Sequence, residues 1–178
     1  VTADYNDKTA YGNTLVEDCY RSGNHTVTGG AGNSGRMNGG FIAMMEKTKD
    51  CIVRRCYSTG DMSALGANGP ISGFIAMIKM ANVPEAMNCT VEQCIAWNKN
   101  VASSRSANNV YACGAVLGCA QEKGTYAQCF RRYDMVFTDD FLTLVDHEDF
   151  VDAMPPLPSY STATHQQAYH GKAAAADA

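Results

Sequence analysis

The chain has 178 residues, of which 46% are hydrophobic and 18% are charged, and its net charge is −4. This length and composition suit one domain with a hydrophobic core. The lysines and arginines are scattered, which argues against a nucleic acid-binding surface and against electrostatic attachment to an anionic membrane. No apolar run reaches the roughly 18 residues that a membrane span requires. Residues 1–13 are polar and do not form a signal peptide, so we expect a fragment or mature form of a longer protein.

Three similar segments follow one another along the chain. They are GGFIAMMEKTKDCIVRRCYSTG (39–60), ISGFIAMIKMANVPEAMNCTVEQCIAWN (71–98) and CGAVLGCAQEKGTYAQCFRRY (113–133). A period between about 20 and 50 residues is typical of stacked repeats. The segments are short, rich in β-branched and aromatic residues, and separated by Gly, Asn and Ser clusters, which predicts strands and turns. The sequence therefore predicts an all-β fold, a β-solenoid of about three to four coils with a short helical C-terminal part.

The repeats divide the chain into two parts. Residues 1–133 are expected to form the solenoid, with units near 14–50, 51–88 and 89–125 and a partial unit from 126. The variable loops fall at the same place in each unit, so they would line one side of the solenoid as a natural binding surface. Residues 134–178 are expected to form a capping or extension segment with short helices, which continues into missing sequence.

Two helices are predicted in this last segment. Asp139 or Asp140 would cap an amphipathic helix whose shared face is apolar. The residues of that face are Phe141, Leu144, Val145 and Val151. The final residues, STATHQQAYHGKAAAADA, predict a capped, alanine-rich helix. The acidic residues between 134 and 152 lack the spacing of a calcium loop, so we interpret them as a solvated face rather than a metal site.

Cysteines mark the repeat register. Cys19, Cys56, Cys94 and Cys129 are separated by 37, 38 and 35 residues, and Cys51 and Cys89 share a second register, with Thr14 and Thr125 at that place in the flanking units. There is no CxxC pair, which disfavours zinc. Identical side chains about 4.8 Å apart on stacked strands point the same way and are poorly aimed for disulfide formation. We therefore expect a ladder of buried free thiols; the alternative is one or two disulfides.

Two further columns follow from the cysteine alignment. Tyr20, Tyr57, Ile95 and Phe130 come directly after the ladder cysteines, and a stacked aromatic and aliphatic column is interpreted as core. Glu17, Arg54 and Glu92 alternate in charge at one register. They predict a cross-coil ion-pair ladder in which each pair contributes about 0.2 to 1 kcal/mol and disfavours a shifted register. The alternative is that these charges are simply solvated.

The repeat resembles a known family. The pattern of a Gly-Gly-hydrophobic strand, a turn and then CIVRRCYSTG is similar to the GLUG-type repeats of bacterial surface proteins, especially of Bacteroidetes, and it is closest at residues 39–60. The resemblance covers about residues 14–133 and weakens in the later units. It implies a right-handed parallel β-helix, a location outside the cell or at its outer surface, and an adhesin-like or glycan-associated role. The motif is structural and implies no functional residues.

The sequence contains no catalytic constellation. Polysaccharide lyases and hydrolases need paired carboxylates or a carboxylate with a basic residue, and the acidic residues here occupy dissimilar registers. Trp97, at the start of a variable loop, is the candidate for ligand contact, although a lone aromatic residue can also cover a coil edge. We therefore expect a non-catalytic module for adhesion, glycan binding or envelope-protein assembly, without cofactor or metal. The alternatives are a polysaccharide lyase or hydrolase and a structural stalk.

Overall fold

The computed structural model describes residues 11–28, 37–46, 48–65, 70–79, 88–103, 114–120, 124–138, 150–153, 169 and 171–174. Every regular element in these ranges is a β-strand. This confirms the all-β prediction for the described part of the chain. No helix in these residues is long and apolar enough to cross a membrane.

The described strands form six sheets, numbered I to VI in chain order from β2 onward. Sheet I contains β2 (Leu15–Glu17), β8 (Ile52–Arg54), β13 (Cys89–Glu92), β17 (Gly124–Ala127) and β20 (Phe150–Ala153). Sheet II contains β3 (Tyr20–Arg21), β9 (Tyr57–Ser58), β14 (Ile95–Ala96), β18 (Phe130–Arg132) and β21 (Lys172–Ala174). Sheet III contains β4 (His25–Thr28), β10 (Met62–Leu65), β15 (Asn100–Ser103) and β19 (Val136–Thr138).

The remaining sheets lie farther along each repeat. Sheet IV pairs β5 (Asn38–Gly39) with β11 (Ile71–Ser72). Sheet V contains β6 (Ile42–Glu46), β12 (Ile75–Lys79) and β16 (Leu117–Ala120). Sheet VI pairs β1 (Tyr11–Gly12) with β7 (Thr48–Lys49). Neighbouring strands in each of these sheets thus come from successive turns of the chain.

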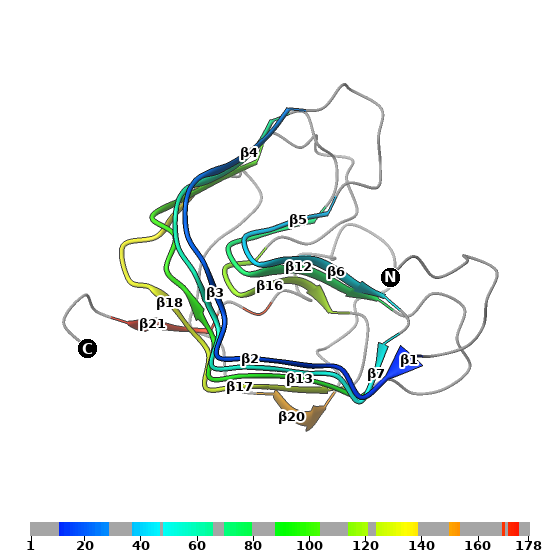
Figure 1. Ribbon diagram of the computed structural model, residues 1–178. Helices are drawn as coiled ribbons and strands as arrows, with labels where there is room; N and C mark the ends of the chain where they lie inside the picture. The colour runs from blue at the N-terminus through cyan, green and yellow to red at the C-terminus, as the bar shows by residue number, and fades with distance from the viewer. Residues whose placement is uncertain are drawn as a thin grey trace.

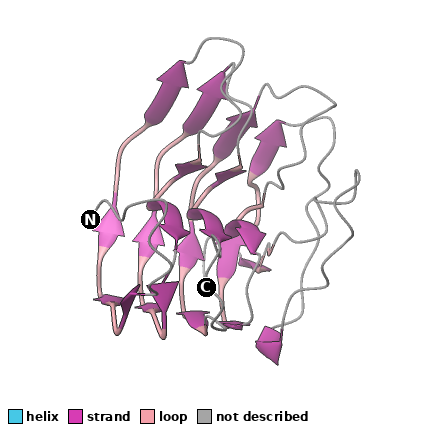
Figure 2. Cartoon of the chain, turned by 90° about the vertical axis from the view of Figure 1, so that its right-hand side faces the viewer, coloured by secondary structure: helices cyan, strands magenta, loops and turns pink. Residues whose placement is uncertain are grey.

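Strands of successive repeats pair in parallel and in the register that the cysteines predicted. In sheet I, Val16 lies opposite Val53, which lies opposite Val91. Viewed along the stack, the strands of each sheet superpose (Figure 1), and from the side they stand next to one another in rows (Figure 2). This topology is consistent with a β-helix.

The core is enclosed by sheets I to V, each of which contributes side chains to one buried cluster. Alternation along β8 places Val53 inward with no exposed surface, while Ile52 and Arg54 are half-buried. The middle strand of sheet V, β12, is apolar on both sides: Ile75, Ala76, Met77 and Ile78 are all fully buried. Figure 1 shows sheet V running inside the outline traced by β2, β3 and β4. A strand enclosed on both faces is expected to read as a continuous hydrophobic run, as FIAMI does.

A left-handed residue forms the corner between sheets I and II in every repeat. Asp18, Arg55, Gln93 and Gln128 have φ values of 54°, 52°, 54° and 52°. Such values are uncommon outside glycine, and nothing in the sequence signalled them. The corner residues also contact one another along the stack, since the side-chain amide of Gln93 donates to Oε1 of Gln128 over 3.1 Å.

The C-terminal segment differs from the prediction. β20 pairs antiparallel with β17, and Tyr169 forms an antiparallel bridge with Leu117, whereas β21 continues sheet II in parallel. The helix expectation is wrong at Lys172–Ala174 and at Val151, which are in strands because neighbouring repeats offer edges for pairing. The other positions of the predicted helices, Asp139, Asp140, Phe141, Leu144 and Val145, lie outside the described residues.

The second cysteine register also needs one correction. Cys89 lies opposite Gly124, not Thr125. The backbones approach closely at this point, because a Cβ atom on Gly124 would come within 2.1 Å of the Cys89 carbonyl oxygen. Only glycine fits there.

Candidate functional site

The cysteine ladder consists of free thiols. The six cysteines whose side chains are described carry no disulfide, and five of them are buried. Each ladder thiol donates to the carbonyl two residues before it, from Cys19 to Glu17 over 3.1 Å and from Cys56 to Arg54 over 3.1 Å. Burial raises the pKa of Cys56, which keeps it a protonated donor rather than a nucleophile.

One member of the ladder departs from the expectation of burial. Cys19 is exposed, whereas Cys56 is 1% exposed and Cys94 is fully buried. The reason is its place in the stack: Cys19 joins β2 to β3, and both strands lie at the end of their sheets. Cys113 lies outside the described residues.

The aromatic column is aligned as predicted, but it is not core. Tyr20 lies opposite Tyr57, which lies opposite Ile95, which lies opposite Phe130. The exposed fractions of Tyr20, Tyr57 and Phe130 are 63%, 40% and 37%. Strand alternation turns the following residue inward instead. The rings of Tyr20 and Tyr57 stack with centroids 5.1 Å apart and planes 8° from parallel.

Two arginines occupy inward positions of sheet II, which sequence reasoning missed. Arg21 is half-buried, and its Nη1 donates to the Gly40 carbonyl over 3.0 Å. Arg131 is 7% exposed, and its Nη1 donates to the Gly171 carbonyl over 2.8 Å. Each of these cations thus donates a hydrogen bond to a backbone carbonyl, which offsets part of the cost of its burial. In the sequence, a charged residue that follows an aromatic one is not expected to point inward, so the positions of these two arginines could not be predicted.

Trp97 lies beside the aromatic column, two residues after Ile95, and is half-buried. The Arg132 guanidinium lies 5.8 Å from the centroid of its ring, in a cation–π arrangement. Arg132 also holds Asp134 through two hydrogen bonds, and this lowers the pKa of Asp134. Tyr133, between them, is 56% exposed. The outward face of sheet II and its edge therefore carry five large apolar side chains: Tyr20, Tyr57, Ile95, Trp97 and Phe130.

The predicted ion pair between Glu17 and Arg54 is confirmed. Nε of Arg54 lies 2.8 Å from Oε2 of Glu17. The sequence did not predict a role for Arg55. Its guanidinium lies 2.6 Å from the Glu17 carboxylate and 2.7 Å from the Asp18 carboxylate. The left-handed corner places Arg55 beside Asp18. Glu92 lies opposite Arg54 in the sheet, but among the described residues no ion pair joins these two. The alternating ladder is thus realised between the first two repeats.

Because of these ion pairs, the stability of the fold is expected to decrease at low pH. The hydrogen bond from Arg54 lowers the pKa of Glu17, and that from Arg55 lowers the pKa of Asp18. A lowered pKa in the fold means that the stabilisation is present above the ordinary pKa and is lost as the pH falls through the folded value. We expect Asp18→Asn to flatten the fall of the melting temperature below about pH 4, measured by circular dichroism. Glu92→Gln is the control and should leave that fall unchanged; equal flattening by both variants would contradict the assignment.

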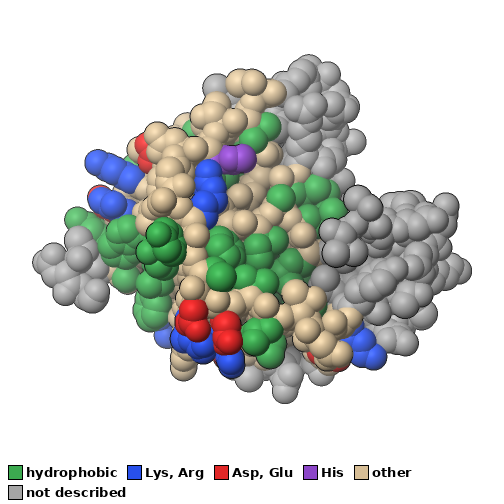
Figure 3. Space-filling model, viewed as in Figure 1, with side chains coloured by type: hydrophobic (Ala, Val, Ile, Leu, Met, Phe, Trp, Pro, Cys, Tyr) green, Lys and Arg blue, Asp and Glu red, His purple; other side chains and the backbone are tan. Residues whose placement is uncertain are grey.

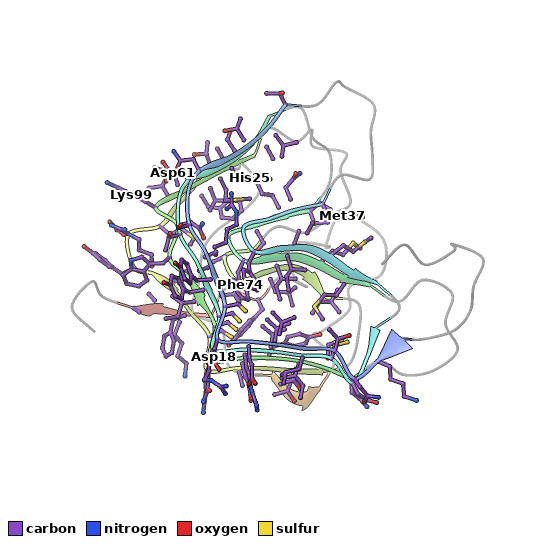
Figure 4. All side chains as sticks on the ribbon, in the orientation of Figure 1. Asp18, His25, Met37, Asp61, Phe74 and Lys99 are labelled. Carbon is purple, nitrogen blue, oxygen red and sulfur yellow. The ribbon has the colours of Figure 1, made fainter. Side chains whose placement is uncertain are left out.

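The corner between sheets II and III is also tied by a carboxylate. Asp61 accepts from the backbone N–H and the side-chain amide of Asn100 over 3.1 and 3.0 Å, and its own N–H donates to Oδ1 of Asn24 over 3.0 Å. Figure 4 shows Asp18 and Asp61 at two successive corners, with Phe74 inside. No group of three or more His, Cys, Asp or Glu side chains suited to a metal occurs in the described residues.

Comparison with known proteins gives no relative. No family model matches the chain, and neither a curated protein nor a solved structure is significantly similar to it.

Proposed function

We propose that the chain is a right-handed parallel β-helix that acts as a non-catalytic glycan-binding module at the outer surface of a bacterium. The parallel sheets with one strand per repeat support the β-helix. The resemblance of residues 39–60 to the GLUG-type repeat supports the handedness and the cell-surface location.

The observation that carries the proposal is the exposed aromatic column of sheet II with Trp97 beside it. The rings of Tyr20 and Tyr57 face each other, so their outward sides offer ring edges and phenol hydroxyls. The phenol hydroxyls can donate hydrogen bonds to sugar hydroxyls and accept them. Trp97 adds apolar ring surface for the C–H groups of a sugar. Contiguous exposed apolar side chains on a soluble domain mark interaction sites.

The acidic residues of the described part favour binding over cleavage. Glu17 and Asp18 are held by Arg54 and Arg55, and Asp61 is held by Asn100. A glycosidase acid needs a raised pKa so that it stays protonated near neutral pH. The pKa values of Glu17 and Asp18 are shifted the other way. The carboxylates of Glu17, Asp18 and Asp61 are therefore assigned to stabilising the fold.

The test is retention on immobilised host and plant polysaccharides, with reducing-end release measured in the same assay. We expect retention without cleavage, and a loss of at least about tenfold in affinity for the double variant Tyr57→Ser with Trp97→Ala, because it removes two ring contacts. Val136→Ser, an exposed site on sheet III, is the control. Cleavage of the polysaccharide, or retention that the double variant does not weaken, would contradict the proposal. An absence of retention would favour a scaffold role.

A further inference from the structure

The first repeat exposes one complete edge of the stack. Strands β1 to β6 each lie at the end of their sheet, and no described strand covers their outer side. Inward positions are open there: Val16 is half-buried and Cys19 exposed, although the equivalent Val53 and Cys56 are 0% and 1% exposed. Leu15 is 50% exposed. Figure 3 shows hydrophobic side chains across this end, between a histidine and the acidic cluster below it.

A second copy stacked head to tail does not fit this edge. At the opposite end, sheet I finishes with the antiparallel strand β20 and sheet II with the parallel strand β21. Within the described ranges, sheet III has four strands where these sheets have five. At that end the described sheets therefore differ in their number of strands, and their last strands differ in direction. At the edge of repeat 1, the strands of all three sheets run in the same chain direction.

A second copy placed face to face does not fit either. A two-fold axis would set the two edges antiparallel. The edge bends at Asp18, with φ of 54°, and again at Gly23, with φ of 94°. A reversed partner meets these bends in the opposite order, so only one of the three sheets can pair at a time. A parallel repeat with the same bends pairs with all of them.

We propose that the outer edge of repeat 1 is a docking surface for one further parallel repeat of the same kind, supplied by a partner protein. The new contact continues the interface between repeats 1 and 2, where Tyr20 stacks on Tyr57 and Phe41 stacks on Phe74 at 5.0 Å. The opposite faces of Tyr20 and Phe41 receive aromatic rings of the partner. The carboxylates of Glu17 and Asp18 receive a basic residue, as they do from Arg54 and Arg55. This proposal does not rest on glycan binding.

The chain's own first repeat serves as the probe. Residues 14–50 are duplicated directly before Thr14 in the full chain, with Cys19→Ser in the added copy, so that the remaining Cys19 reports on the original edge. We expect the reaction of this thiol with a disulfide reagent to slow at least tenfold under native conditions, and the melting temperature to rise. The matched control carries Tyr20→Lys and Phe41→Lys in the added copy and should react like the parent.

Light scattering of the parent chain separates the possible occupants. We expect a monomer at all concentrations, with a reactive Cys19. An oligomer with a protected Cys19 would identify a second copy as the occupant and overturn the proposal. A protected Cys19 in the monomer would show that the chain covers its own edge, with the same consequence. A duplicated chain whose original Cys19 reacts as fast as in the parent would also overturn it.

Discussion

Replacing Phe74 with alanine is expected to destabilise the protein by about 3 to 5 kcal/mol. Phe74 has no exposed surface and belongs to the core cluster that joins sheets I to V. Its ring stacks on Phe41 with planes 2° from parallel. Truncation removes this contact and leaves a cavity that rigid strands on both sides cannot fill. Because small domains are stable by only about 5 to 15 kcal/mol, urea denaturation followed by circular dichroism should show a large fall in midpoint.

Phe41→Ala is the matched control for this prediction. Phe41 occupies the same register one repeat earlier, but it is only partly buried, because it lies at the open edge of the stack. We expect less than half of the loss seen for Phe74→Ala, since less apolar area is removed from water at this position. Equal losses for the two variants would mean that the edge of repeat 1 is covered in solution, contrary to the exposure of Cys19 and Leu15.

The period and the strand register could be predicted because they depend on residue types repeated at fixed intervals. Aligning the cysteines was enough to place Tyr20 opposite Tyr57 and Glu17 opposite Arg54. Which side chains of sheet II point outward and which point inward could not be predicted in the same way. Hydrophobic residues are normally assigned to the interior, but the left-handed corner before each strand turns the aromatic residue outward and the next residue inward. Arg131 is accommodated inside because a backbone carbonyl accepts a hydrogen bond from its guanidinium.

The C-terminal strands were missed for a related reason. Alanine favours a helix by less than about 1 kcal/mol per residue over most other residues, and such a local preference yields to tertiary pairing. Ala173 lies opposite Arg131 in sheet II, where an existing strand edge supplies hydrogen bonds. The candidate site was predicted only in part: Trp97 was chosen from the sequence, whereas the exposure of Tyr57 and Phe130 appears only in the structure.

Replacing Gly60 with alanine is expected to be more damaging than the same change at Gly23, although the two glycines share a register and a conformation. Their φ values are 93° and 94°, and for a residue with a side chain this region costs about 1 to 3 kcal/mol. A Cβ atom on Gly60 would also come within 2.3 Å of the Gly23 carbonyl oxygen, whereas one on Gly23 would meet nothing within 4 Å. We therefore expect Gly23→Ala to lose about 1 to 3 kcal/mol and Gly60→Ala to lose 4 kcal/mol or more, on the order of the largest single-residue effects.

The comparison isolates the spacing between repeats. Both variants introduce the same backbone strain, so their difference in free energy of unfolding, measured by urea denaturation, reports only the clash of Gly60 with the backbone of repeat 1. That backbone is held by parallel pairing on both sides of the corner, at Tyr20 with Tyr57 and at His25 with Met62. It cannot move away without breaking one of these pairings. Equal losses at the two sites would show that repeat 1 gives way, and the stack would then be looser at its open end than the pairing implies.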